Sequence, residues 1–215
     1  MTGTSGADGR RIGLLGGTFN PPHLGHLLLA QEAHDQLGLD RVVFVPVAVP
    51  PHKEADGDPG AAARVELCRR AVGGDDRFDV STLEVERGGA SYTVDTLREI
   101  HATSPGDELS FIVGGDMASS LPTWREPADV LRLARLAVAE RDGVRRADIL
   151  DRLSSLPGAA ERVDFFDLPR VDVSSSLVRR RIAAGHPIRY LVPDSVAEYI
   201  TANGLYRSAV GSPSP

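Results

Sequence analysis

The chain has 215 residues, of which 41% are hydrophobic, and a formal net charge of −6 at pH 7. This length suffices for one sizeable core, and the acidic balance argues against a general nucleic-acid surface, which would need a basic stripe. The single cysteine, Cys68, excludes an internal disulfide and a zinc site built from several thiolates.

The first predicted elements are a strand, a glycine turn and a helix. Residues 12–15 form a short apolar run bounded by glycine, which is typical of a buried strand, and residues 24–37 carry apolar side chains at helical spacing. Gly16 and Gly17 allow the backbone to approach a ligand closely, and Pro22 leaves the N–H groups of the helix start free. Such a helix start is an anion-binding site.

His23 and His26 fall in the first turn of this helix. Because they are three residues apart, both imidazoles lie on one face and point back towards the helix N-terminus. Two donors would therefore face an anion bound there. A zinc site at this pair would need a third ligand that is not evident, so we expect no metal held by the protein alone. Each feature separately is compatible with packing or capping, but their combination within residues 16–26 favours a binding site.

Strands and helices alternate along the middle of the chain. We predict strands at 41–47, 109–113, 136–140 and 163–166, one or two short strands within 78–86, and helices at 61–72, 129–132 and 145–153. A further helix ends near His101, with Ser91 or Thr93 as its cap and Asp95 in its first turn. Cys68 is expected in the core. The alternation predicts an α/β fold with a doubly wound, mostly parallel sheet.

Ligands of an open parallel sheet gather outside the carboxyl ends of its strands. This position makes Asp116, which follows the strand at 109–113, and the proline-rich loop that ends in Lys53 candidates for the site. Lys53 is the only lysine among 24 basic residues, and its compact ammonium differs chemically from a guanidinium. Trp124, the only tryptophan, lies in a short loop between prolines, which suits a stacking surface.

A second candidate anion site begins the last third of the chain. Ser174, Ser175 and Ser176 open a predicted helix and offer hydroxyl groups beside its free N–H groups, and Arg179 follows about one turn later. Capping alone would also explain the serines. Two such helix starts, one near each end of the chain, fit a nucleoside triphosphate held from two sides. We expect them to converge on one triphosphate.

The chain closes with a helix predicted at 193–203, capped by Asp194 or Ser195. No linker demands a second domain, so we expect a single domain over 10–207 with a small helical part at its C-terminal end. The small, polar tails are expected to be disordered, at 1–9 and 208–215.

Several classes are excluded by motif. The sequence contains neither the Gly-x-x-x-x-Gly-Lys-[Ser/Thr] pattern of P-loop enzymes nor the Gly-x-Gly-x-x-Gly pattern of dinucleotide-binding folds. No apolar run approaches the roughly 18 residues of a membrane span, and no signal peptide is visible, so we expect a cytoplasmic protein without a membrane partner.

With these residues in view, the chain resembles the nucleotidyltransferase superfamily marked by His-x-Gly-His, and more closely the bacterial nicotinate-nucleotide adenylyltransferases. Further segments match that family in order: Pro50-Pro51-His52-Lys53, Ser91 to Leu97, Phe111 to Asp116 with Trp124, Val173 to Arg179, and Leu191 to Tyr206. Two residues depart from the family pattern. Asn20 stands where aspartate is common, which puts any charge role there in doubt, and Ser176 replaces the usual threonine but keeps the hydroxyl.

The resemblance implies adenylyl transfer from ATP to nicotinate mononucleotide, giving nicotinate adenine dinucleotide and pyrophosphate, with Mg²⁺ carried by the phosphates of ATP and by water. It implies that His23, His26 and Arg179 are catalytic. The implied ATP-binding residues are Gly16, Gly17, Thr18, Phe19, His23, His26, Gly114, Asp116, Ser174, Ser175, Ser176 and Arg179. The implied mononucleotide-binding residues are Lys53, Tyr92, Thr93, Trp124 and Arg125.

Other interpretations stay open. Nicotinamide mononucleotide or phosphopantetheine could be the acceptor, although phosphopantetheine adenylyltransferases are typically shorter and have no counterpart to the segments around Ser91 and Trp124. A tRNA synthetase would need a Lys-Met-Ser-Lys-Ser-like loop, which one lysine cannot supply. A catalytically silent nucleotide sensor is the alternative from another class. No nucleic-acid partner is expected, and assembly into a homo-oligomer is left open.

Overall fold

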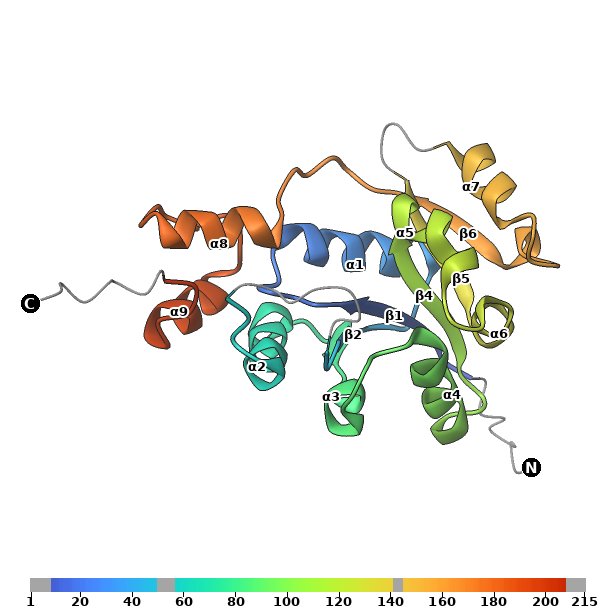
Figure 1. The fold of residues 1–215 in the computed structure, drawn as a ribbon, viewed down its shortest axis with the longest axis horizontal. Coiled ribbons are helices and arrows are strands. Elements are labelled where there is room, and N and C mark those ends of the chain that lie inside the picture. Colours follow the sequence, from blue (N-terminus) through green and yellow to red (C-terminus); the bar gives the residue numbers. More distant parts are fainter. Residues whose placement is uncertain (1–8, 50–56, 141–144, 208–215) are drawn as a thin grey trace, which may run out of the picture.

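The computed structural model describes residues 9–49, 57–140 and 145–207. Within these ranges, six parallel strands form one sheet in the order β3-β2-β1-β4-β5-β6 (Figure 1). The strands are β1 (Arg11–Gly17), β2 (Arg41–Pro46), β3 (Phe78–Val80), β4 (Glu108–Gly114), β5 (Arg135–Glu140) and β6 (Val163–Asp167). The predicted α/β fold with a doubly wound parallel sheet is confirmed.

Helices cover both faces of the sheet. The helices are α1 (Leu24–Leu37), α2 (Ala61–Val72), α3 (Leu83–Arg87), α4 (Thr93–Thr103), α5 (Gly115–Ser120), α6 (Pro127–Leu133), α7 (Arg146–Leu153), α8 (Ser175–Ala183) and α9 (Asp194–Ala202), with short 3₁₀ turns at Leu121–Thr123 and Ala160–Arg162. None of the described helices is long and apolar enough to cross a membrane.

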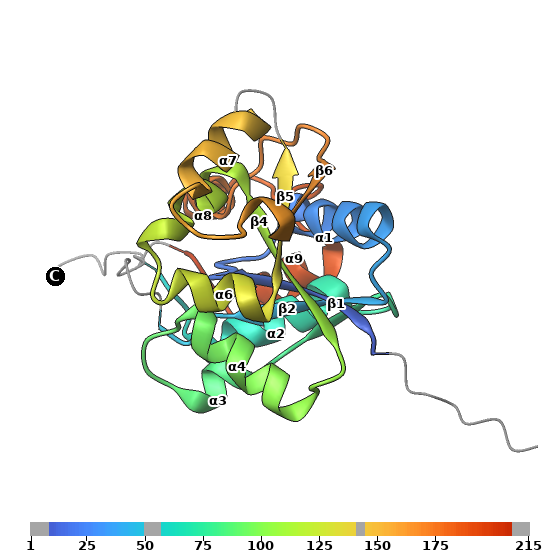
Figure 2. The same cartoon turned by 90° about the vertical axis from the view of Figure 1, so that its right-hand side faces the viewer.

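Alternating side chains of the strands divide the core into two layers. Ile12 and Leu14 of β1 pack into the layer formed with α4, α6 and α7, whereas the adjacent Leu15 packs into the layer formed with α1 and α2. This is the period of two that a strand buried on both faces requires. The view in Figure 2 shows α4 and α6 next to each other on one side of the sheet, with α1 on the other.

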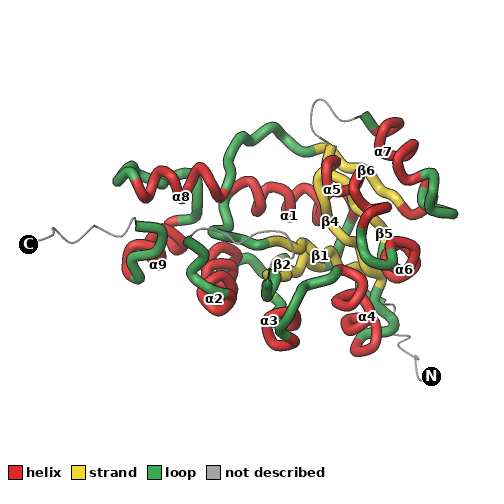
Figure 3. Tube along the Cα trace, in the orientation of Figure 1, coloured by secondary structure: helices red, strands yellow, loops and turns green. Residues whose placement is uncertain are grey.

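A third apolar cluster holds the C-terminal helices to the sheet domain. It joins Leu67 of α2 to Val178 of α8 and to Val196 and Ile200 of α9. The segment from β6 to α8 passes α1 without regular structure (Figure 3), and α8 and α9 then lie together at one end of the molecule (Figure 1). The predicted small helical part is therefore present.

Some local predictions were wrong. The stretch 78–86, predicted to hold one or two short strands, holds one, β3. Residues 83–86 belong instead to α3, because the Ser81 hydroxyl accepts from the Leu83 N–H and begins a helical turn. Helix α4 is preceded by Tyr92, whose side chain makes no capping bond, rather than by a Ser91 or Thr93 cap. Pro193 precedes α9, and the Ser195 hydroxyl bonds instead to the Arg70 carbonyl, at 2.7 Å.

Cys68 lies in the core, as predicted, with an exposed fraction of 0%. Burial raises the pKa of its thiol well above the usual value, because the thiolate would lose its hydration, although the neighbouring Arg64 opposes the shift. We expect the native protein to leave a disulfide reagent such as 5,5′-dithiobis(2-nitrobenzoate) unreacted, and the urea-unfolded chain to react at one thiol, followed by absorbance. Reaction of the native protein at the rate of the unfolded chain would contradict this burial.

Candidate active site

The order of the strands reverses at the centre of the sheet. The chain moves outwards from β1 to β2 and β3 on one side, and from β4 to β5 and β6 on the other. Ligands of doubly wound sheets bind outside the carboxyl ends of the strands where the order reverses, which is here between β1 and β4. The turn that follows Gly17 and the start of α5 at Gly115 flank this point.

The turn after β1 is held in one conformation by packing. A Cβ at Gly16 would lie 3.2 Å from the Phe111 ring, and one at Gly17 would lie 3.0 Å from the Phe19 ring, so the two positions have little room for a side chain. Phe19 has a φ of 50°, which costs a non-glycine residue on the order of 1 kcal/mol. Its buried ring packs at 5.0 Å from the His26 ring and offsets that strain.

The predicted histidine pair is adjacent in space. His23 is the N-cap of α1, His26 is its third helical residue, and their ring centroids lie 3.8 Å apart. The backbone N–H of His23 donates to Nδ1 of His26 at 3.2 Å. In a neutral imidazole the proton of His26 must therefore lie on Nε2, which makes that nitrogen a donor.

The start of α8 meets the same loop. The Ser175 hydroxyl donates to the Pro21 carbonyl at 2.8 Å, and Nη1 of Arg179 donates to the Asn20 carbonyl at 2.7 Å. The structure therefore brings together the two helix starts that the sequence places about 150 residues apart.

The serines at the start of α8 have different local roles. Ser174 caps the helix by accepting from the Leu177 N–H at 3.1 Å, and Ser176 accepts from Nη2 of Arg179 at 3.4 Å. Since the Ser175 proton goes to a carbonyl, the α8 start offers a ligand chiefly its backbone N–H groups and the Arg179 guanidinium.

The residues predicted for the mononucleotide lie around α4 and the turn after α5. Trp124 is half-buried, donates its indole N–H to the Ser120 hydroxyl at 3.0 Å, and meets the Phe111 ring edge-on at 5.9 Å. Arg125 lies over the Tyr92 ring at 4.9 Å. Thr93 is the first residue of α4, so its N–H is among the free donors of that helix start.

Arg125 is also engaged within the protein. It donates to the carboxylate of Asp95, in the first turn of α4, at 3.1 Å. A neighbouring arginine, Arg98, joins α4 to α6 by ion pairs with Glu126 and Asp129. These pairs hold the Trp124 turn against the start of α4.

Two further predicted site residues are Lys53 and Asp116. Lys53 lies outside the described residues, as does the rest of the 50–56 segment. Asp116 is exposed in the first turn of α5, and Gly114 rather than a side chain forms the cap, so Asp116 is available to a ligand at the carboxyl end of β4.

Sequence reasoning missed Arg64 and gave Asn20 no role. Arg64 is 1% exposed in the middle of α2, at a position of the helix that otherwise carries apolar side chains. Asn20 is 2% exposed, and among the described residues neither polar atom of its side chain has a hydrogen-bond partner. A charged residue at a buried helical position was the signal for Arg64.

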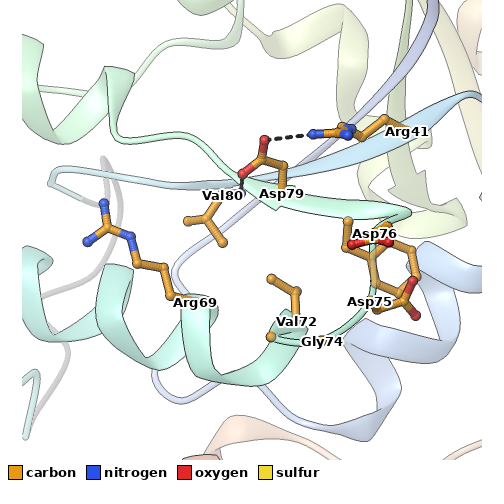
Figure 4. A pocket seen from close by; sticks show the side chains of 10 residues that line it. Arg41, Arg69, Val72, Gly74, Asp75, Asp76, Asp79 and Val80 are labelled. Carbon is orange, nitrogen blue, oxygen red and sulfur yellow. Dashed lines mark hydrogen bonds and ion pairs between the residues drawn. The ribbon is translucent and has the colours of Figure 1, made fainter.

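The described structure also contains hollows away from these residues. The hollow in Figure 4, about 330 Å³, lies beside Arg41 and Phe78, where β2 and β3 begin. It is therefore at the amino edge of the sheet, away from the carboxyl ends of β1 and β4. Within the described ranges, no group of three or more His, Cys, Asp or Glu side chains could hold a metal ion.

Comparisons with known proteins agree with this geometry. A family model described as cytidylyltransferase-like matches residues 14–181. A probable nicotinate-nucleotide adenylyltransferase of Desulfitobacterium hafniense (strain Y51) is 43% identical over 92% of this chain and 96% of its own length. A protein of the same description from Halalkalibacterium halodurans is 43% identical over 96% of each chain.

Solved structures share the fold. Nicotinic acid mononucleotide adenylyltransferase of Plasmodium falciparum, in complex with NaAD, aligns with a TM-score of 0.74 at 18% identity, over 92% of this chain and 97% of that one. The same protein in complex with APC aligns with a TM-score of 0.73 at 16% identity, over the same shares of the two chains.

Proposed function

Because the chain belongs to the cytidylyltransferase-like family, among relatives described as nicotinate-nucleotide adenylyltransferases, we propose that it transfers the adenylyl group of ATP to nicotinate mononucleotide. The products are nicotinate adenine dinucleotide, an intermediate of NAD biosynthesis, and pyrophosphate. The observation that carries this function is the meeting of the α1 and α8 starts through the Ser175 to Pro21 and Arg179 to Asn20 hydrogen bonds. A cytoplasmic location is part of the same proposal.

The reaction is an in-line displacement at the α-phosphorus of ATP. The mononucleotide phosphate oxygen forms the new P–O bond while the bond to pyrophosphate breaks, and no covalent enzyme intermediate is required. Catalysis then depends on holding the two substrates in line and on stabilising the charge that grows on the leaving pyrophosphate.

His26 is placed to supply part of that stabilisation. Its Nδ1 accepts from the His23 backbone N–H, so a neutral ring carries its proton on Nε2, and this bond sets the direction of that donor. Arg179 adds a guanidinium that is already oriented by the Asn20 carbonyl. The buried amide of Asn20 lies in the same loop and can donate to a phosphate oxygen that completes its hydrogen bonding.

The other residues named from the sequence are assigned by position. The turn from Gly16 to Phe19 lines the triphosphate, Ser174 to Ser176 present the α8 start to it, and Gly114 with Asp116 lies beside the ribose of ATP. Thr93 and its backbone neighbours contact the ring carboxylate, with Trp124 stacked on the pyridine ring. Lys53, outside the described residues, is assigned to the mononucleotide phosphate.

Mg²⁺ enters as part of the ATP substrate. The ion would be held by phosphate oxygens and water, which are the oxygen ligands that Mg²⁺ prefers. The protein's own groups then meet the phosphates around the ion.

The proposed function is tested by offering nicotinate and nicotinamide mononucleotide side by side and measuring pyrophosphate release. We expect the acid to be preferred in kcat/KM by about 10- to 100-fold, since a hydrogen bond to a charged group contributes about 1.5–3 kcal/mol. Preference for the amide would reassign the acceptor, and ATP binding without pyrophosphate release from either would indicate a nucleotide sensor.

A further inference from the structure

We propose that Arg64 is a positioning residue, which holds the ends of β1 and β2 in one arrangement so that the triphosphate site and the mononucleotide site face each other. The proposal rests on the function proposed above. Arg64 lies in α2 and is not assigned a contact with either substrate.

One buried guanidinium joins two separate parts of the backbone through three carbonyls. Nη1 of Arg64 donates to the Thr18 carbonyl at 3.0 Å and to the Val47 carbonyl at 2.7 Å, and Nη2 donates to the Ala48 carbonyl at 2.9 Å. Nε donates to the Asp58 carboxylate at 3.1 Å, which balances the charge. The side chain is 1% exposed, so its charge is stabilised by these partners and very little by water.

The bonds to Thr18 reach the triphosphate side. Thr18 directly precedes Phe19, whose ring packs against the His26 ring. The Gly17 carbonyl also accepts from the Val47 N–H at 3.1 Å. The position of the β1 turn, and with it the orientation of His26, is therefore set relative to the end of β2.

The bond to Ala48 reaches the mononucleotide side. The Ala48 carbonyl is held by Arg64, and its N–H donates to the Ser91 hydroxyl at 3.0 Å. Ser91 directly precedes Tyr92 and Thr93, at the start of α4. Arg64 is thus the shared neighbour of two loops that are assigned to different substrates.

The chemistry of the guanidinium explains why arginine fits this position. Its planar fork donates in several fixed directions at once, whereas a lysine ammonium is a point charge that cannot reach three carbonyls in the same geometry. A side chain needed only to fill α2 would be apolar, as at the neighbouring buried positions Val65 and Cys68.

A positioning role and a purely structural role predict different kinetics. If Arg64 only stabilises the fold, its replacement lowers the melting temperature and the folded fraction, while each folded molecule turns over normally. If Arg64 aligns the two sites, each substrate still binds but the reacting atoms are out of line, and a displacement of about 1 Å can cost about 10²-fold in rate. The loss then appears in kcat rather than in either KM.

The test compares Arg64→Lys and Arg64→Met with Arg69→Met, an exposed arginine on the same helix that lines the hollow of Figure 4. Turnover of ATP with nicotinate mononucleotide is measured well below each variant's melting temperature. We expect both Arg64 variants to lose about 10- to 100-fold in kcat with each KM within about threefold, and Arg69→Met to match the natural protein. A normal kcat per folded molecule would overturn the proposal.

A second pair of variants leaves Arg64 in place and keeps the test decisive if its variants do not fold. Ser91→Ala removes the bond to Ala48, and Asp58→Asn removes the charge on the partner of Nε. We expect each to lower kcat, and the double variant to lose less than the product of the single losses, because both act on one network. Losses that multiply independently would refute the shared network. No turnover by the natural protein would instead count against the proposed function.

Discussion

Replacing His26 with alanine is expected to lower kcat by roughly 10² to 10⁴, the size seen when one preorganised donor to a developing charge is lost. The direction of that donor depends on the bond from the His23 backbone to Nδ1 of His26, which exists before any ligand binds. Steady-state pyrophosphate release at saturating ATP and mononucleotide measures the effect. The KM values should change much less than kcat, because the interaction strengthens as pyrophosphate leaves.

His34→Ala is the matched control for this result. His34 lies on the same helix but in its last turn, at the opposite end from the site. Its replacement should leave turnover unchanged. A His26 variant with near-normal kcat and an unaltered melting temperature would remove this side chain from the mechanism.

The second large effect is expected at Arg179. Arg179→Met removes a guanidinium fixed by the Asn20 carbonyl, and should lower kcat/KM for ATP by roughly 10² to 10³. Arg179→Lys should recover only part of this loss, because an ammonium cannot hold the Asn20 carbonyl and a phosphate in the same fork-like geometry. Initial rates over a range of ATP concentrations, at saturating mononucleotide, separate the contributions to kcat and KM.

Arg180→Met controls for the loss of one positive charge from α8. Arg180 is the next residue and is exposed, so it has the same charge on the same helix but projects in a different direction from the helix axis. If the two variants lost activity equally, the loss would come from the lower positive charge of α8 as a whole, and the specific role of Arg179 would be rejected.

Most of the fold could be predicted because the hydrophobic patterns of its longer helices and strands continue without interruption. The bounds predicted for α1 and α2 match the structure, since glycine residues end or precede the apolar pattern at Gly38 and Gly60. Helix α3, at the end of the stretch predicted to hold one or two short strands, was missed for the opposite reason. Its five residues, from Leu83 to Arg87, are too short a stretch for period 2 and period 3.6 to be distinguished.

The candidate site was predictable only in part. The histidine pair and the serine-opened helix follow from local pattern, but the contacts of Ser175 with Pro21 and of Arg179 with Asn20 depend on how distant segments pack. Arg64 was missed because its role depends on three backbone carbonyls that no sequence pattern reveals. Side chain to backbone bonds of this kind place no constraint on the identity of the accepting residue.

The contacts between the first loop and α8 also bear on the protein's synthesis. Ser175 and Arg179 donate hydrogen bonds to carbonyls that lie 154 and 159 residues earlier in the chain. A nascent polypeptide still attached to the ribosome can pair the strands up to β5 before α8, which carries Ser175 and Arg179, has been translated. Such a chain lacks one half of the proposed ATP site. ATP binding therefore cannot stabilise early folding intermediates, and it stabilises the fold only after α8 has been synthesised and has packed.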